Sequence, residues 1–208
     1  MGFRSALFAS RYDSATRHME ETELGRRRAA LLAGLTGDVL DIGAGTGANL
    51  PHFPASCTVT AVEPDPHMRR RLEEKVASGA AGAAVSVSDG SAEALPAEDG
   101  TIDAVVFTLV LCTVPDQPSA LAETRRVLKP GGRLLFLEHI RGTGRHAKAQ
   151  DLLRPFWSFG AQGCQINRET PAAIAAAGFV LDLQEQFSLD PGWLPVNPFV
   201  VGTGTKAG

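Results

Sequence analysis

The feature that most constrains this chain is a glycine-rich turn between a short apolar strand and a helix. Residues 38–42 form the predicted strand, and Gly43, Gly45 and Gly47 follow it at every second position. Glycine permits positive φ angles and lets the backbone approach a ligand closely. In open α/β sheets, ligands bind just outside the carboxyl ends of the strands. The turn therefore predicts both an α/β fold and a ligand site.

The remaining segments alternate between strands and helices. Predicted strands cover 58–62, 84–87, 103–111, 133–138, 179–187 and 198–203, and predicted helices cover 5–33, 66–77, 119–128 and 170–178. The fully apolar run 103–111 indicates a strand buried on both faces. No helix separates the last two strands, so we expect them to pair antiparallel. The predicted fold is one doubly wound, Rossmann-like α/β domain: a mostly parallel, seven-stranded sheet with an antiparallel C-terminal edge hairpin.

Charge and length exclude several classes of protein. A chain of 208 residues has the size of one α/β domain. The net charge of −3 argues against a nucleic-acid binder, and the basic runs 26–28 and 69–71 are interpreted as solvated helix faces. The longest apolar run, 104–114, is too short to span a bilayer, and we find no signal peptide. A cytoplasmic enzyme, either a monomer or a weak homodimer, is expected.

The cysteine pattern points the same way. Cys57, Cys112 and Cys164 are an odd number with no C-x-x-C pair. This pattern disfavours a disulfide framework or a cysteine-rich zinc site and fits a reducing compartment. We therefore expect no metal.

Two acids near the turn select the ligand. The glycines satisfy a relaxed dinucleotide pattern, but the carboxylate of Asp41 would face a pyrophosphate and repel it. S-adenosylmethionine has no phosphate and carries a sulfonium and an ammonium group. Glu63, which follows the second strand, can accept hydrogen bonds from both ribose hydroxyls. The alternative is a tight turn with two solvated acids.

The segments VLDIGAGTG (39–47) and VEPD (62–65) resemble the class I S-adenosylmethionine-dependent methyltransferases, and the match runs across nearly the whole chain. GSAEALP (90–96) resembles their adenine-binding motif, with Ser91 where an acid is usual; adenine recognition then passes to Asp89 or to the backbone. The segment 108–114 resembles the one that lies under methionine. The resemblance implies these cofactor contacts: Tyr12, Asp41, Gly43, Gly45, Gly47, Glu63, Pro64, Asp89, Ser91, Ala92, Thr108 and Leu109.

Three further segments carry a narrower resemblance. TLVLCTV (108–114), EHI (138–140) and GCQINRE (163–169) are similar to the thiol S-methyltransferase branch of the methyltransferase-like proteins. This resemblance implies S-methylation of a small thiol. N-methylation of an amine, such as a phospholipid head group, and a non-catalytic S-adenosylmethionine-binding domain stay open as alternatives.

The acceptor side is less defined. His139, at the end of a strand, is the candidate catalytic base because its unperturbed pKa is near 6.5; the alternative is a structural histidine. Cys112 either lines the pocket or belongs to the core. The least regular stretch holds Phe156, Trp157, Phe159 and Cys164, which we expect to line an acceptor pocket. A lid that only shields the sheet edge is the alternative.

The single domain, 1–208, then divides into four parts. Residues 1–36 are the N-terminal helical cap, from which Tyr12 is expected to close over the donor, and 37–140 are the S-adenosylmethionine-binding core. Residues 141–170 are the acceptor lid, and 171–208 are the last helix and the strand pair.

Overall fold

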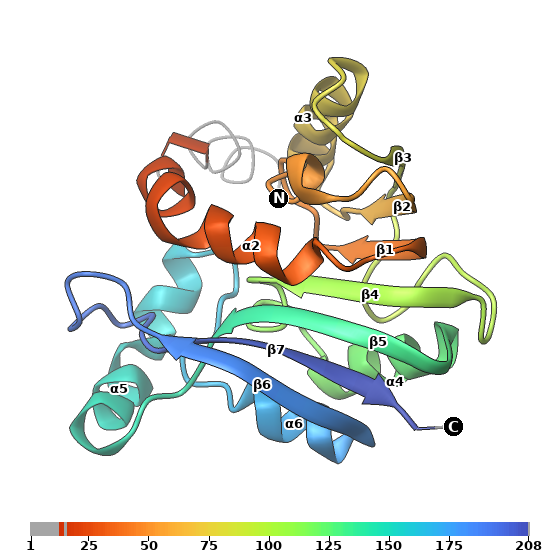
Figure 1. Ribbon diagram of the computed structural model, residues 1–208. Coiled ribbons are helices and arrows are strands. Elements are labelled where there is room, and N and C mark those ends of the chain that lie inside the picture. The colour runs from red at the N-terminus through yellow and green to blue at the C-terminus, as the bar shows by residue number, and fades with distance from the viewer. Residues whose placement is uncertain (1–12, 15, 208) are drawn as a thin grey trace.

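A seven-stranded sheet forms the centre of the protein (Figure 1). The computed structural model describes residues 13, 14 and 16–207. The strand order is β3-β2-β1-β4-β5-β7-β6, and only β7 runs against the others. This confirms the predicted fold and the antiparallel edge hairpin. The strands are β1 (Gly37–Ile42), β2 (Cys57–Val62), β3 (Ala84–Ser88), β4 (Ile102–Thr108), β5 (Leu128–His139), β6 (Phe179–Phe187) and β7 (Phe199–Lys206).

Helices connect the strands and cover the sheet. They are the π-helix η1 (Glu20–Leu24), α2 (Gly25–Leu32), the 3₁₀ helix η2 (Leu50–His52), α3 (Pro66–Ala77), α4 (Gln117–Val127), α5 (Gly144–Gly160) and α6 (Thr170–Ala176). Asp65 caps α3, because its side chain accepts hydrogen bonds from the backbone of His67 and Met68, and Pro66 opens the helix.

Two sequence predictions about helices need correction. The stretch 141–169, expected to be irregular, contains the 17-residue helix α5, which continues through Pro155. Leu152, Phe156 and Phe159 do have the i, i+4, i+7 spacing of a helix, but they form a solvent-exposed face and not a core-facing one. The sequence Thr170-Pro171 favours threonine as a helix cap with proline at the first helical position, but Thr170 is itself the first residue of α6, and Glu169 precedes it without a side-chain cap.

The core is split between the two faces of the sheet. Strand β4 shows why, since Val105 and Phe107 join the cluster under α4 and α6, whereas Ala104 and Val106 join the cluster under α2. Side chains alternate between faces along a strand, so a strand covered on both sides is apolar at every position. The prediction that this run is buried on both faces is confirmed.

The N-terminal helices are fixed to the sheet by buried arginines. Arg27 forms ion pairs with Glu23 and Glu185, and Arg28 pairs with Glu20; the arginines are 7% and 2% exposed. The interpretation of run 26–28 as a solvated face is therefore wrong for these two residues. Their charges are neutralised in place, which burial requires.

Among the described residues, no helix combines the length and apolar character needed to cross a bilayer.

Candidate active site

A cavity of about 470 Å³ opens at the carboxyl ends of β1, β2 and β4. It lies where the strand order reverses between β1 and β4, the place where open α/β sheets bind ligands. Many predicted cofactor residues line it: Gly43, Gly45, Glu63, Pro64, Ser91, Ala92, Thr108 and Leu109. The wall also contains residues that the predicted contacts did not include: Ile42, Val62, Asp65, Met68, Gly90, Glu93, Val110, Thr113, Val114, Pro115, Ala161 and Gln162.

The glycines of the turn have different roles. Gly43 has a φ of 61°, and a Cβ atom there would lie 2.7 Å from the side chain of Val110. Gly45 has a φ of 59°, and the nearest protein atoms to its Cβ would be 3.9 Å away. A side chain at Gly45 would therefore project into the cavity. Gly47 does not line the cavity; a Cβ there would press on Leu50 and Leu72 in the core.

Glu63 stands at the cavity wall after β2. Its Oε2 accepts a hydrogen bond from the backbone N–H of Gly45 at 2.8 Å, and its Oε1 accepts one from Asp65 at 2.8 Å. Burial raises the pKa of Glu63, and the two backbone donors oppose this. Because each carboxylate oxygen has a second lone pair, Glu63 can still accept hydrogen bonds from a ligand.

Asp41, expected to face the ligand, is buried behind the turn and is absent from the cavity wall. Its Oδ1 accepts a hydrogen bond from the side chain of Asn49, which also donates to Thr108 and accepts from Arg28. Burial raises the pKa of Asp41 to about 7. Its Oδ2 has no hydrogen-bond partner among the described residues. The carboxylate is thus part of a buried polar network under the turn.

The segment after β3 is only partly as predicted. Ser91 and Ala92 line the cavity, but Asp89 is exposed and lies outside the wall. Glu93 lines the cavity instead, as an acid that the sequence analysis did not select. Tyr12 lies outside the described residues.

The loop after β4 forms the opposite wall. Leu109 has a φ of 63°, which is uncommon for a non-glycine residue. Glu138, fully buried in β5, holds this loop: its Oε1 accepts hydrogen bonds from the backbone of Val110 at 2.7 Å and Leu111 at 2.8 Å. Sequence reasoning missed Glu138; the available signal was an acid that directly follows the apolar run 134–137 within a predicted strand.

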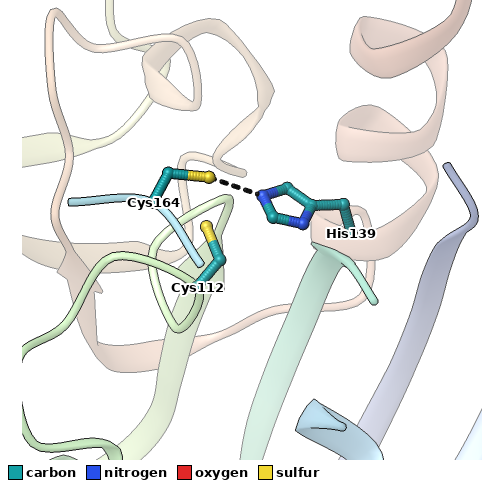
Figure 2. Close-up of side chains that lie close together, drawn as sticks. All are labelled: Cys112, His139 and Cys164. Atoms are coloured by element: carbon teal, nitrogen blue, oxygen red, sulfur yellow. Dashed lines mark hydrogen bonds between the residues drawn. The ribbon is translucent and has the colours of Figure 1, made fainter. Parts of the chain in front are cut away.

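Three candidate acceptor residues meet beside the cavity. Cys112, His139 and Cys164 come from the β4 loop, the end of β5 and the segment after α5, and they converge (Figure 2). Nε2 of His139 lies 3.0 Å from Sγ of Cys164. Hydrogen bonding from Cys112, opposed by burial and assisted by His139, lowers the pKa of Cys164 to about 5.

None of these three side chains lines the cavity, and all are buried. His139 ends β5 as predicted, but its side chain turns towards the two sulfurs and does not line the cavity, where a base was expected. Placing Cys112, His139 and Cys164 in direct contact with the acceptor is therefore not supported by this geometry.

The predicted aromatic pocket is also different. Phe156 and Phe159 are 78% and 71% exposed on α5 and do not line the cavity. Trp157 packs instead against Cys112, Cys164 and neighbouring apolar residues. The end of α5 reaches the cavity through Ala161 and Gln162. Phe156 and Phe159 are three residues apart and share the exposed face of the helix, whereas Trp157 lies on a different face. The three aromatic side chains therefore cannot line one pocket.

The proteins that resemble this chain in sequence or in fold are described as methyltransferases. A family model described as a methyltransferase domain matches residues 40–136. Human thiol S-methyltransferase TMT1B is 34% identical over 96% of this chain and 84% of its own length. Phosphatidylethanolamine N-methyltransferase of Cereibacter sphaeroides is 30% identical over 63% of this chain and 65% of its own. A solved methyltransferase structure from Thermotoga maritima, 23% identical, superposes with a TM-score of 0.74 over 99% of this chain and 100% of that one.

Proposed function

The chain belongs to the family of S-adenosylmethionine-dependent methyltransferases that includes the thiol S-methyltransferases, and we propose that it methylates a small thiol. The observation that supports a thiol acceptor is the set of side chains in the cavity wall. Among the described residues, the cavity wall contains acids, hydroxyl and amide groups and apolar groups, but no histidine, lysine or arginine. A wall whose only titratable groups are carboxylates, which are weak bases, suits an acceptor that needs little help from a base.

The wall also fits the methyl donor. Its titratable side chains are the acids Glu63, Asp65 and Glu93, which favour a cationic ligand and offer no counter-charge to a phosphate. The volume of about 470 Å³ falls within the ordinary range for small-molecule sites. No side chain fills the space beside Gly45 in the cavity. Each carboxylate oxygen of Glu63 accepts one backbone hydrogen bond and has a lone pair left for a ligand. We therefore assign Glu63 to the ribose hydroxyls and the turn to the methionine end.

When bound, S-adenosylmethionine supplies a methyl group activated by its sulfonium. The protein then has to align the acceptor and exclude water, and such positioning supplies most of the rate. We assign this work to the loop after β4, where Val110, Val114 and Pro115 give an apolar surface and Glu138 fixes the backbone. Ala161 and Gln162 close the acceptor side.

The acceptor's own acidity decides how much help it needs. At a pKa near 8.5, a few per cent of a thiol is thiolate at pH 7, and thiolate is a strong nucleophile. An alcohol is almost wholly protonated and needs a general base within hydrogen-bond reach. The described cavity wall offers no histidine for this role and only carboxylates, which are weaker bases, and this favours sulfur over oxygen.

An amine is the second candidate acceptor, because a phosphatidylethanolamine N-methyltransferase is among the relatives. An amine also needs no enzymic base once it is deprotonated. The amine's higher pKa distinguishes it, since the rate would then rise at higher pH than for a thiol.

The test is a release assay for S-adenosylhomocysteine with a matched aromatic thiol, phenol and aniline, followed by the pH dependence of kcat/KM. We expect turnover with the thiol, a rise of about tenfold per pH unit below the thiol pKa, and a plateau near it. Thiols of lower pKa should reach the plateau at lower pH. An inert thiol alongside an active phenol or aniline contradicts the proposal.

A further inference from the structure

The buried cluster of Cys112, His139 and Cys164 has the composition of a metal site. The three side chains are 2%, 4% and 8% exposed as residues, and their potential ligand atoms all lie within 4.8 Å of one another. They belong to three segments that meet only in the fold, and Figure 2 shows the two sulfurs close together, with the sulfur of Cys164 bonded to the His139 ring.

Hydrogen bonds already link the three side chains of the cluster. Cys164 is bonded to Nε2 of His139 at 3.0 Å and to Cys112, whose other contact, to the hydroxyl of Thr113, is long at 3.4 Å. Nδ1 of His139 has no partner among the described residues. The fold thus holds two thiols and one imidazole in mutual contact, inside the protein, where buried polar groups are nearly always paired.

We propose that Cys112, His139 and Cys164 bind a single Zn²⁺ ion. Two thiolates and one imidazole are an established zinc ligand set, and two thiolate charges balance the ion in a buried site. Around zinc, with bonds of about 2.3 Å to sulfur and about 2.0 Å to nitrogen, the ligand atoms would lie roughly 3.5–3.8 Å apart. The present separations of up to 4.8 Å need a contraction of about one ångström.

The site has no fourth ligand of the usual kind among the described residues, because no further cysteine, histidine or acid joins the cluster. Three protein ligands with one open position are typical of zinc sites that bind a water or a substrate, whereas structural sites have four. The cluster is next to the cavity wall, since Cys112 contacts Thr113 and Cys164 packs near Ala161, and both neighbours line the cavity.

The open position suggests a task for the ion, which rests on the proposed function. A thiol acceptor bound as the fourth ligand loses its proton to solvent and is held as a thiolate at the end of the cavity. Its sulfur lone pair then forms the bond to the methyl carbon, while the carbon–sulfur bond of the sulfonium breaks and its electron pair stays on the donor sulfur. S-adenosylhomocysteine and the thioether are the products.

The first test is metal content and affinity of the full chain. We expect a single zinc ion per chain in the wild type and in Cys57→Ser, because Cys57 is a buried free cysteine in β2 outside the cluster. Cys112→Ser, Cys164→Ser and His139→Ala should each weaken Zn²⁺ binding by roughly 100-fold or more. Wild-type protein that binds no Zn²⁺, or Cys112→Ser that binds it like the wild type, overturns the proposal.

The second test needs no variant. Chelator-treated wild-type protein is titrated with Co²⁺ as a spectroscopic probe, and thiolate-to-cobalt charge-transfer absorption with tetrahedral visible bands is expected. Addition of an aromatic thiol should then change the visible bands, and the matching phenol should not. Absence of the charge-transfer absorption contradicts the metal site; bands that ignore the thiol contradict the fourth-ligand role. Thiol turnover that persists in metal-free protein would remove the ion's task and leave the proposed function intact.

Discussion

The two sides of the cavity are built in different ways. The donor side comes mostly from one continuous stretch, in which the turn after β1 and the tip of β2 carry Gly43, Gly45 and Glu63. The acceptor side is assembled from the loop after β4 and the segment after α5, which are about fifty residues apart in the chain (Figure 1). The donor side is held by backbone geometry, and the acceptor side by packing between distant segments.

The two sides should therefore respond differently to amino-acid substitutions. Where glycine backbone forms the wall of a site, a side chain added to that glycine occupies the space of the ligand directly. A single substitution can therefore block binding. A packed site depends on several side chains at once, so one truncation weakens binding without abolishing it. Variants on the two sides should therefore separate donor affinity from acceptor KM.

The largest effect is expected on the donor side. Gly45→Val should weaken S-adenosylmethionine binding by at least about 100-fold in calorimetry, because the side chain fills the open part of the wall. Gly79→Val is the matched control, since Gly79 also has a positive φ and open space around it but lies outside the cavity. It should carry the same backbone strain and bind the donor normally. Equal losses in both variants would assign the effect to strain.

The next effect tests the ribose assignment. Glu63→Ala should weaken donor binding by roughly 10- to 100-fold, because hydrogen bonds to a charged group contribute about 1.5–3 kcal/mol each. Glu63→Gln should lose less, since the amide oxygen still accepts one hydrogen bond. Acceptor KM, measured at saturating donor, should change little in both. Unchanged donor affinity in the alanine variant would remove Glu63 from the site.

A smaller effect is expected on the acceptor side. Trp157→Ala should raise the acceptor KM by about 3- to 10-fold and leave the donor affinity nearly unchanged, because Trp157 packs against the cluster beside the acceptor end. Phe156→Ala, from an exposed neighbour on the same helix, should match the wild type. If the donor affinity and the melting temperature fall together, Trp157 has only a structural role.

A separate effect, on stability and not on binding, concerns the buried acid behind the donor turn. The pKa of Asp41 rises from 3.8 to about 7, so the folded protein binds more protons than the unfolded chain between these values. Stability should therefore fall as pH rises from about 4 to 7, by at most about 1.4 kcal/mol per pH unit from this group. Asp41→Asn should flatten the slope in urea titrations at several pH values. A slope identical to the wild type would show that Asp41 is ionised throughout.

The contrast between local backbone geometry and packing of distant segments also explains which features could be predicted from the sequence. Strand β4 and the turn after β1 were predictable, because an apolar run and spaced glycines reflect local backbone requirements. Asp41 was placed near the turn correctly, but its partner Asn49 was not identifiable from local pattern. The convergence of Cys112, His139 and Cys164 depends on how the loop after β4, the end of β5 and the segment after α5 meet in the fold, and the cysteine spacing alone pointed away from a metal.

The exposed side chains of α5 give the complementary lesson. Phe156 and Phe159 were predicted to line the pocket from their apolar character, which says that a residue tends to be buried but not where it points. Trp157, between them, does face inward. The helical period separates them, and it was missed because the stretch was interpreted as irregular.

The most direct test of the account is a competition for a labelled methyl group. The enzyme is given S-adenosylmethionine labelled at its methyl carbon together with equal amounts of a matched thiol, phenol and aniline, and the products are separated by mass spectrometry. The account predicts that the label appears almost entirely as the methyl thioether. Label that appears mainly on oxygen or nitrogen, with the thiol left unmethylated, would contradict it.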